Sequence, residues 1–174
     1  MKYIFFLICL FIILHTRAES LFSNHLSEVN GLPTNEVYNI HQDKKGYIWF
    51  ATENGLYRFD GSSYKAYTYP NISNKAGSYI QEDHLGRIWY MSFDGAIFYT
   101  QNDSLIPLKN ETLSSLSQII IIDDIIIYFT RNKVITFQNI LDFKIIKSIN
   151  LQQEISSIYQ DNKSVMIIGD HQAY

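Results

Sequence analysis

The stretch "DKKGYIWFATENGLYRFDG", residues 43–61, decides the fold because much of it returns later in the chain. The second stretch, residues 83–100, reads "DHLGRIWYMSFDGAIFYT". At a constant offset of 40 residues, Asp43, Gly46, Trp49 and Gly55 have counterparts in Asp83, Gly86, Trp89 and Gly95. A fixed period of this size is typical of propeller blades and other stacked repeats.

Each repeat contains two turn signals. Asp43 can accept hydrogen bonds from turn amides, and Gly46 can take the positive φ that closes a type I turn with a bulge. The segment "DHLG", residues 83–86, repeats this turn. Further along, Asn54-Gly55 and Asp94-Gly95 are residue pairs that two-residue hairpin loops prefer. The repeat is therefore expected to be a series of hairpins.

The segments between these turns have the composition of β-strands. Aromatic and β-branched residues fill "YIWFAT", residues 47–52, and "RIWYMS", residues 87–92. The run 56–59 can form a third strand. After a turn at Asp60-Gly61, the alternating run 64–69 can form a fourth. One unit is then a blade of four short antiparallel strands.

Later segments keep this rhythm but lose the Gly and Trp residues. The strands of a third blade are expected at 117–122, 125–130, 134–139 and 143–151. Its unbroken Ile runs indicate strands that are covered on both faces. A buried helix is the alternative, but Asp123-Asp124 interrupts the run and β-branched residues dominate it. Residues 154–174 repeat the opening half of one more blade.

The chain is therefore predicted to be all-β, built of β-propeller blades with four antiparallel strands each. The copies amount to about three and a half blades. Because a propeller typically has about 4 to 8 blades, the predicted propeller is incomplete. No low-complexity linker interrupts residues 21–174, which are expected to form one array.

The first residues have the pattern of a secretory signal peptide. A positive start at Met1-Lys2 precedes the apolar run Tyr3–Leu14, and small residues follow. The run is shorter than the roughly 20 residues that span a bilayer, although a membrane anchor that stays attached is the alternative. We expect residues 1–18 to be a signal peptide, cleaved at 18/19 or at 20/21, and the protein to be exported.

Composition excludes several classes of function. Of the 174 residues, 47% are apolar and 18% are charged, so a packed core is feasible. The formal net charge of −3 gives no basic surface for nucleic acid. The single cysteine, Cys9, lies within the predicted signal peptide, so the mature chain is expected to have neither a disulfide framework nor thiol chemistry.

Residues that could carry acid–base chemistry have simpler interpretations as parts of turns. The Asp-Gly-Trp cluster at Asp43 is similar to the Asp box of sialidase-type propellers, but its Asp-to-Gly spacing is longer and His41 stands where the box has Ser. The carboxylate pairs Glu82-Asp83 and Asp123-Asp124 fall on predicted turns. Adjacent residues on a turn rarely face each other as a catalytic acid and base do.

Histidines and aromatic residues give no specific site either. The histidines His25, His41, His84 and His171 lack metal-ligand spacing and are expected in surface loops. Stacking against sugars is an option for Trp49, Trp89, Tyr57, Tyr64, Tyr67 and Tyr69, but packing between blades is the alternative. We therefore predict no catalytic, cofactor-binding or metal-binding residues. Ligand-binding residues stay unassigned, within variable loops such as Tyr69–Ser78 and Asn102–Leu113.

Residues 31–61, "GLPTNEVYNIHQDKKGYIWFATENGLYRFDG", resemble the two-component regulator propeller repeat family. The family pattern falls on Gly31-Leu32-Pro33, Asp43, Gly46, Ile48-Trp49, Gly55-Leu56, Phe59 and Asp60-Gly61. The second unit lacks the Gly-Leu-Pro opening, and the third has lost both Gly and Trp.

The resemblance implies the extracytoplasmic N-terminal sensor region of a bacterial hybrid sensor histidine kinase. Such a segment senses a ligand and transduces a signal without catalysis, and the expected location is periplasmic or extracytoplasmic. The implied partners are a small ligand such as an oligosaccharide, and the kinase region of the full-length sensor or a homodimer partner. No kinase module is visible, so a truncated N-terminal part is expected, with membrane contact only through the missing C-terminal part. The alternatives are a propeller-type glycan-active enzyme and a protein-interaction scaffold.

Overall fold

The computed structural model describes residues 26–69, 75–108, 116–130, 133–152, 155–160 and 164–169. The predicted signal peptide, residues 1–18, and both of its cleavage positions lie outside the described residues. Apart from one short 3-10 turn, η1 (Glu28–Asn30), every regular element of the described part is a β-strand. The prediction of an all-β chain is confirmed.

The described strands form three four-stranded antiparallel sheets, here called blades 1 to 3, and one two-stranded sheet, the half-blade. Blade 1 contains β1 (Val37–Gln42), β2 (Ile48–Thr52), β3 (Gly55–Phe59) and β4 (Tyr64–Tyr67). Blade 2 contains β5 (Gly77–Glu82), β6 (Ile88–Ser92), β7 (Ile97–Gln101) and β8 (Ser104–Pro107). Blade 3 contains β9 (Leu116–Ile122), β10 (Ile125–Thr130), β11 (Val134–Asn139) and β12 (Ile145–Asn150). The half-blade contains β13 (Ile155–Gln160) and β14 (Val165–Gly169).

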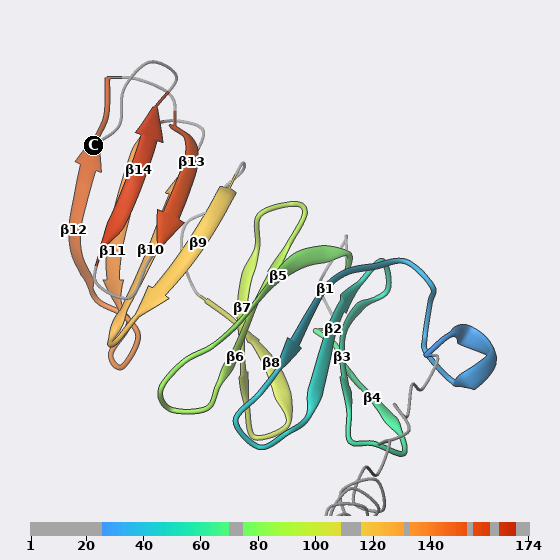
Figure 1. Cartoon of the computed structure of the whole chain (residues 1–174). Coiled ribbons are helices and arrows are strands. Elements are labelled where there is room, and N and C mark those ends of the chain that lie inside the picture. Colours follow the sequence, from blue (N-terminus) through green and yellow to red (C-terminus); the bar gives the residue numbers. More distant parts are fainter. Residues whose placement is uncertain are drawn as a thin grey trace, which may run out of the picture.

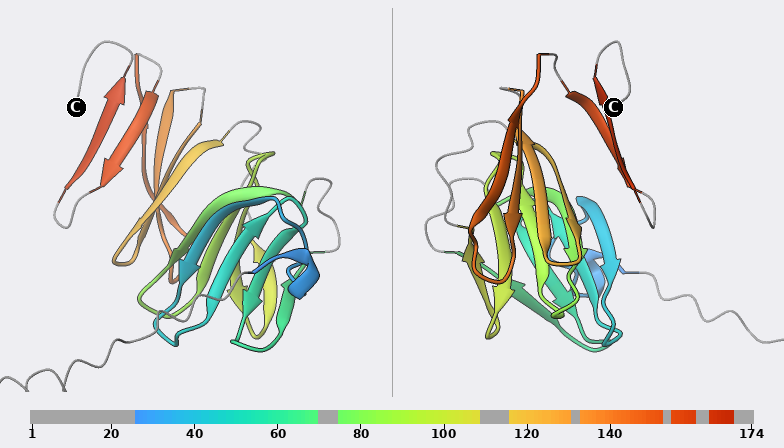
Figure 2. Two further views of the ribbon diagram at one scale, coloured as in Figure 1. Left: turned by 45° about the vertical axis from the view of Figure 1, so that its right-hand side comes forward. Right: turned by 90° about the vertical axis from the view of Figure 1, so that its left-hand side faces the viewer.

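The blades follow one another in chain order, as Figure 1 and both views of Figure 2 show. Within each blade, every strand pairs with the next strand along the chain. The first strands of successive sheets contact each other, β1 with β5, β5 with β9 and β9 with β13. This is the arrangement of blades around a propeller axis. In the described part the blades form an open arc, so the prediction of an incomplete propeller is confirmed.

A buried Asp–Trp hydrogen bond organises the first hairpin of blade 1. The indole Nε1 of Trp49 donates to Asp43 Oδ2 at 2.8 Å. The other carboxylate oxygen, Oδ1, accepts from the backbone N–H groups of Lys45 and Tyr47, each at 2.9 Å. One carboxylate therefore holds the turn and fixes the ring of the following strand. Gly46 closes the turn with φ 87°, as the sequence predicts.

Blade 2 repeats this geometry and adds one partner. Trp89 Nε1 donates to Asp83 Oδ2 at 2.8 Å, and Arg87 Nε donates to the same oxygen at 2.7 Å. Burial alone would raise the pKa of the Asp83 carboxyl. The hydrogen bonds from Trp89 and Arg87, together with the charge of Arg87, outweigh burial and hold that pKa below its ordinary value. Trp49 and Trp89 thus occupy equivalent places in successive blades, as predicted.

The second hairpin differs from the prediction. In blade 1 the two loop residues are Glu53 and Asn54, because Thr52 pairs directly with Gly55. Gly55 has φ 111°, whereas Asn54 keeps a negative φ. The pair Asn54-Gly55 was thus predicted one residue too far along the chain. The two loop residues have negative φ, and the positive φ, which glycine takes at no steric cost, falls on the residue that follows them.

The corresponding loop of blade 2 is one residue longer. The N–H of Gly95 donates to Ser92 O at 2.9 Å, and the N–H of Ser92 donates to Ala96 O at 3.0 Å. The loop therefore has three residues, Phe93 to Gly95, and Asp94-Gly95 is not the two-residue loop that was predicted. Trp49 pairs with Arg58, so an offset of 40 would pair Trp89 with Phe98. Because of the longer loop, Trp89 pairs with the next residue of β7, Tyr99.

The Ile runs of blade 3 are strands covered on both faces, as predicted. Ile119 and Ile121 pack with Trp89 of blade 2 in one buried cluster. Ile120, between them, points the other way into a second cluster, against which Val165 of the half-blade packs. Alternate residues of one strand thus pack against two neighbouring sheets.

Across the part of the chain that the structure describes, no helix has the length and apolar character needed to cross a bilayer.

Candidate functional site

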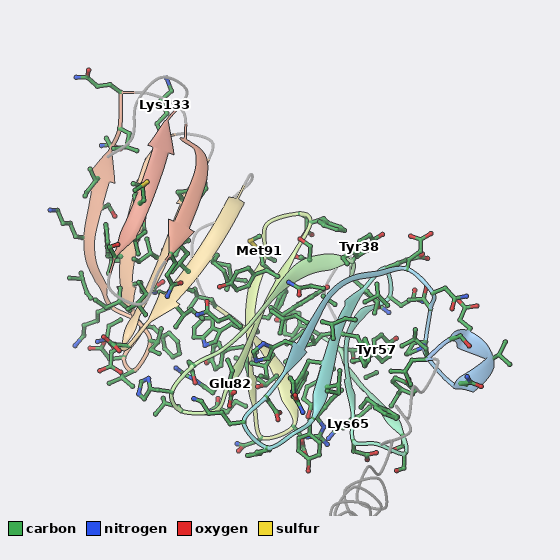
Figure 3. The ribbon with its side chains drawn as sticks, viewed as in Figure 1. Tyr38, Tyr57, Lys65, Glu82, Met91 and Lys133 are labelled. Atoms are coloured by element: carbon green, nitrogen blue, oxygen red, sulfur yellow. The ribbon has the colours of Figure 1, made fainter. Side chains whose placement is uncertain are left out.

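A cavity of about 440 Å³ lies between blades 1 and 2, here called the interblade cavity. Its volume falls within the roughly 300–1,000 Å³ of typical ligand sites. The lining residues used below are Lys45, Tyr47, Trp49, Arg58 and Tyr67 from blade 1, and Arg87 and residues 100–103 from blade 2. Figure 3 shows Lys65, which contacts this lining, and Glu82 on the lower side of blades 1 and 2, and Tyr38 and Met91 on the upper side of these two blades.

A stacked guanidinium forms one wall of the cavity. The guanidinium carbon of Arg58 lies 4.4 Å from the ring centre of Tyr47, and at 5.9 and 5.8 Å from those of Trp49 and Tyr67. Contacts of this kind are favourable because the faces of aromatic rings carry negative charge. The Arg58 side chain is 22% exposed. It is therefore held in place by three rings and remains accessible to solvent.

Blade 2 also combines an arginine with a tyrosine, but the two residue types have exchanged positions. Arg87 occupies the turn position that Tyr47 has in blade 1, and Tyr99 occupies the strand position of Arg58. The guanidinium of Arg87 again lies over aromatic rings, 5.4 Å from Trp89 and 5.3 Å from Tyr99. Blades 1 and 2 therefore each place one cation next to a buried Trp, from strand β3 in blade 1 and from the first turn in blade 2.

A carboxylate from blade 2 faces the cations of blade 1. Asp103 lies at the tip of the β7–β8 hairpin and has φ 62°. Its Oδ1 accepts a hydrogen bond from Tyr67 Oη at 2.9 Å and lies 3.1 Å from Lys65 Nζ and 3.8 Å from Arg58 Nη1. The hydrogen bonds from Lys65 and Tyr67, followed by the nearby positive charges, hold the pKa of the Asp103 carboxyl below its ordinary value. Burial and the bond to Asp103 raise the pKa of Tyr67 to about 12, so its hydroxyl is a proton donor at neutral pH.

The two carboxylates of the cavity both have partners in the protein. Asp43 is held by its turn and by Trp49, and Asp103 is held by Lys65 and Tyr67. Both carboxylates are therefore occupied by donors of the protein itself. Within the described part of the chain, no three His, Cys, Asp or Glu side chains gather as metal ligands do. The arrangement can bind, through stacking, charge and hydrogen bonds.

Of the two histidines of the described part, His84 lies in an exposed turn, as expected, whereas His41 lies in a strand. His41 lies in β1, paired with Trp49, and its Nε2 is enclosed without a hydrogen-bond partner. The turn residue His84 joins two blades, since its ring nitrogens lie 3.2 Å from Asp123 O and from Asp124 Oδ1. His25 and His171 lie outside the described residues.

The aromatic candidates divide between packing and the cavity. Trp49 and Tyr67 line the interblade cavity, while Trp89 is buried between blades 2 and 3. Tyr64 stacks on Phe59, with ring centres 4.6 Å apart, and Tyr69 packs against Phe98. Tyr57 is half-buried in β3.

Both predicted loop segments were too long, because Gly77 and Ser78 belong to β5 and Ser104–Pro107 form β8. Asn102 and Asp103, at the start of the predicted loop 102–113, line the cavity, whereas residues 109–113 and 70–74 lie outside the described residues. Sequence reasoning missed Arg58, Lys65 and Arg87. The sequence did contain a signal for Arg58. A charged residue within a strand of apolar and aromatic residues is unusual, since arginine is rarely buried without a partner.

Residues 31–54 match the family described as two component regulator propeller. The chain carries a two-component regulator propeller repeat. This repeat includes the Asp43–Trp49 turn and ends at the second hairpin, so the segment that matches the family is also the one that builds the inner half of blade 1. No curated protein matches the chain in sequence.

Solved structures share the fold of the array that contains the repeat. The extracellular domain of BT4673 from B. thetaiotaomicron, described in one structure as a one-component system and in another as a hybrid two-component system, superposes with a TM-score of 0.70 in both. The identities are 16% and 17%, and 89% and 84% of this chain are covered. Only 23% and 21% of the BT4673 chains are covered, so this chain spans less than a quarter of their length.

Two further structures show how widely the fold occurs. Virginiamycin B lyase from Staphylococcus aureus has 20% identity and a TM-score of 0.62, covering 80% of this chain and 50% of its own. The computationally designed protein Ika4 has 11% identity and a TM-score of 0.61, covering 91% of this chain and 98% of its own. These likenesses establish a fold that is shared by proteins of different kinds.

The two arginines are predicted to differ in their contribution to stability. Arg87→Gln removes bonds to buried Asp83 and to Ile140 O, 3.0 Å from Arg87 Nη2, so we expect a loss of about 2–4 kcal/mol in the free energy of unfolding. Arg58→Gln removes its contacts with three aromatic rings and a loose contact with a solvent-exposed carboxylate, so we expect a smaller loss of about 1 kcal/mol. Urea unfolding of both variants measures this. An equal or larger loss for Arg58→Gln would contradict the assignment of Arg87 as the structural arginine.

Proposed function

We propose that this chain is the ligand-sensing propeller segment of an extracytoplasmic two-component sensor, and that it signals without catalysing a reaction. The observation that carries the proposal is the two-component regulator propeller repeat at residues 31–54. The shared fold with the extracellular domain of BT4673, described as part of a hybrid two-component system, supports it. By the same resemblance, its partners are the kinase region of a longer sensor or a second sensor copy.

The chemistry of the interblade cavity supports binding over turnover. Its carboxylates are paired with donors, and the half-buried ring of Tyr47 lies beside amide and hydroxyl groups of residues 100–102. Such a lining suits a small polar ligand with one flat face, such as a sugar. A ligand biases the sensor only if it binds the signalling state better than the resting state.

A glycan-active enzyme is the second candidate, and a protein-interaction scaffold is the third. The fold of virginiamycin B lyase, which is an enzyme, matches 80% of this chain. A fold does not carry a reaction by itself, and catalysis requires an acid and a base that the cavity would have to supply from Asp43 and Asp103. Both of these groups are engaged by other side chains.

We further propose that the protein is exported and loses a signal peptide, residues 1–18 or 1–20. The positive start, short apolar run and small residues of the sequence support this. Mass spectrometry of the protein from the cell-envelope fraction should give a chain that begins at residue 19 or 21. An intact Met1 on a cytosolic product would contradict the proposal.

Deletion of the propeller segment is expected to abolish the response of the sensor to its ligand. The experiment is a transcriptional reporter assay on the complete sensor gene, with and without residues 21–174, across a panel of oligosaccharides. In parallel, the purified chain is incubated with the same panel and products are sought by chromatography. A ligand response that survives the deletion, or measurable cleavage of any glycan, would overturn the proposal.

A further inference from the structure

We propose that the interblade cavity recognises a ligand carboxylate, and that the side chain of Asp103 marks the place where this carboxylate binds. The inference rests on the proposed sensing function and names its ligand class: a small sugar acid or a related carboxylic acid with a polar ring. It arises from how Arg58, Lys65 and Tyr67 meet Asp103, which no sequence pattern indicates.

Blade 1 presents a set of donors that suits a carboxylate. Arg58 in β3 and Lys65 in β4 are paired across the sheet, so their side chains leave the same face next to each other. Tyr67, two residues further in β4, lies on that face as well. All three point at one oxygen of Asp103, at 3.8, 3.1 and 2.9 Å respectively. Two positive charges and one hydroxyl donor therefore converge on a single negative group.

The carboxylate of Asp103 occupies these donors and is exposed to solvent. It comes from another blade, at the tip of a hairpin whose residues Asn102 and Asp103 both have positive φ. Its side chain is 65% exposed. Exposed ion pairs contribute little to stability because water competes with them. A ligand carboxylate that brings further contacts can take its place at small cost.

Arg58 has the properties of a recognition residue. Its stacking on Tyr47 restrains the guanidinium before any ligand binds, which reduces the entropy lost on binding. Its contact with Asp103 at 3.8 Å is longer than a hydrogen bond, and its Nε is enclosed without a hydrogen-bond partner. The hydrogen-bonding capacity of this guanidinium is thus only partly used. A planar guanidinium matches a carboxylate in two-point geometry.

The remaining lining indicates what the carboxylate is attached to. The half-buried ring of Tyr47 offers some flat apolar surface, whereas Trp49 and Tyr67 are each 4% exposed and packed against each other. Thr100, Gln101 and Asn102 offer neutral polar groups. A sugar ring presents one apolar face and several hydroxyl groups, so it suits both. The cavity of about 440 Å³ has the capacity for such a ligand.

The test compares an acid with its neutral counterpart. Isothermal titration of the purified chain with methyl β-D-glucuronide and methyl β-D-glucoside should show that the glucuronide binds at least about tenfold more tightly, the effect of one charge-assisted contact. Sodium acetate, a carboxylate without a ring, should bind more weakly than the glucuronide if the aromatic lining contributes. Binding of acetate equal to that of the glucuronide would overturn the sugar-acid part of the inference.

Variants separate recognition from structure. Arg58→Gln and Lys65→Gln should each weaken glucuronide binding about tenfold, and Asp103→Asn should strengthen it because a competing negative charge is removed. Lys147→Gln, an exposed lysine on blade 3, is the matched control and should change nothing. Circular dichroism confirms that each variant is folded. Weaker binding to Asp103→Asn, or equal binding of glucuronide and glucoside, would overturn the inference.

These outcomes are distinguishable from failure of the proposed function. If the chain binds neutral glucosides as well as glucuronides and the reporter responds to a neutral oligosaccharide, the sensing function stands and the carboxylate inference is wrong. If glucuronide binds as predicted but the deletion of residues 21–174 leaves signalling intact, the binding site stands and the sensing function is wrong.

Discussion

The buried hydrogen bond between a turn carboxylate and an indole N–H is the interaction on which the rest of this structure depends. In blades 1 and 2, Asp43 and Asp83 are 8% and 2% exposed, and each accepts a hydrogen bond from the Trp six residues later. A buried carboxylate is costly unless it is fully hydrogen-bonded. Since the turn amides and the indole supply those bonds, the charge that would destabilise the core instead fixes the turn, the strand that follows and the position of the Trp ring between blades.

That constraint also creates the candidate site. The Asp43 turn places Lys45 and Tyr47 at the edge of blade 1, and the fixed ring of Trp49 gives Arg58 a surface on which to lie. The repeated residues therefore build a platform, while the hairpin tip at Asn102 and Asp103 differs between blades and supplies the group that faces it. This division between a rigid scaffold and variable loops is usual for binding sites.

Much of the fold could be predicted from the sequence because its signals are local. Neighbours within one hairpin determine the Asp-to-Gly turns, the strands and the places of the two equivalent Trp residues. In blade 3, Asp123-Asp124 marks where one Ile-rich strand ends and the next begins. The site could not be predicted, because it depends on the register between hairpins. One extra residue in the loop of blade 2 moves Tyr99 into the place that Arg58 has in blade 1. At a constant offset of 40, Tyr47 aligns with Arg87, but Arg58 aligns with Phe98, so the equivalence of Arg58 and Tyr99 is invisible in the sequence.

The measurement that tests this account most directly is a double-mutant cycle on the blade 2 turn. Urea unfolding of Asp83→Ala, Trp89→Phe and the double variant gives the coupling between the carboxylate and the indole N–H, since phenylalanine keeps most of the ring packing. If the hydrogen bond organises the blade, the two substitutions should be coupled by about 1 kcal/mol or more. Losses that add to within about 0.5 kcal/mol would show that the two side chains contribute independently, and would contradict the central role assigned to their hydrogen bond.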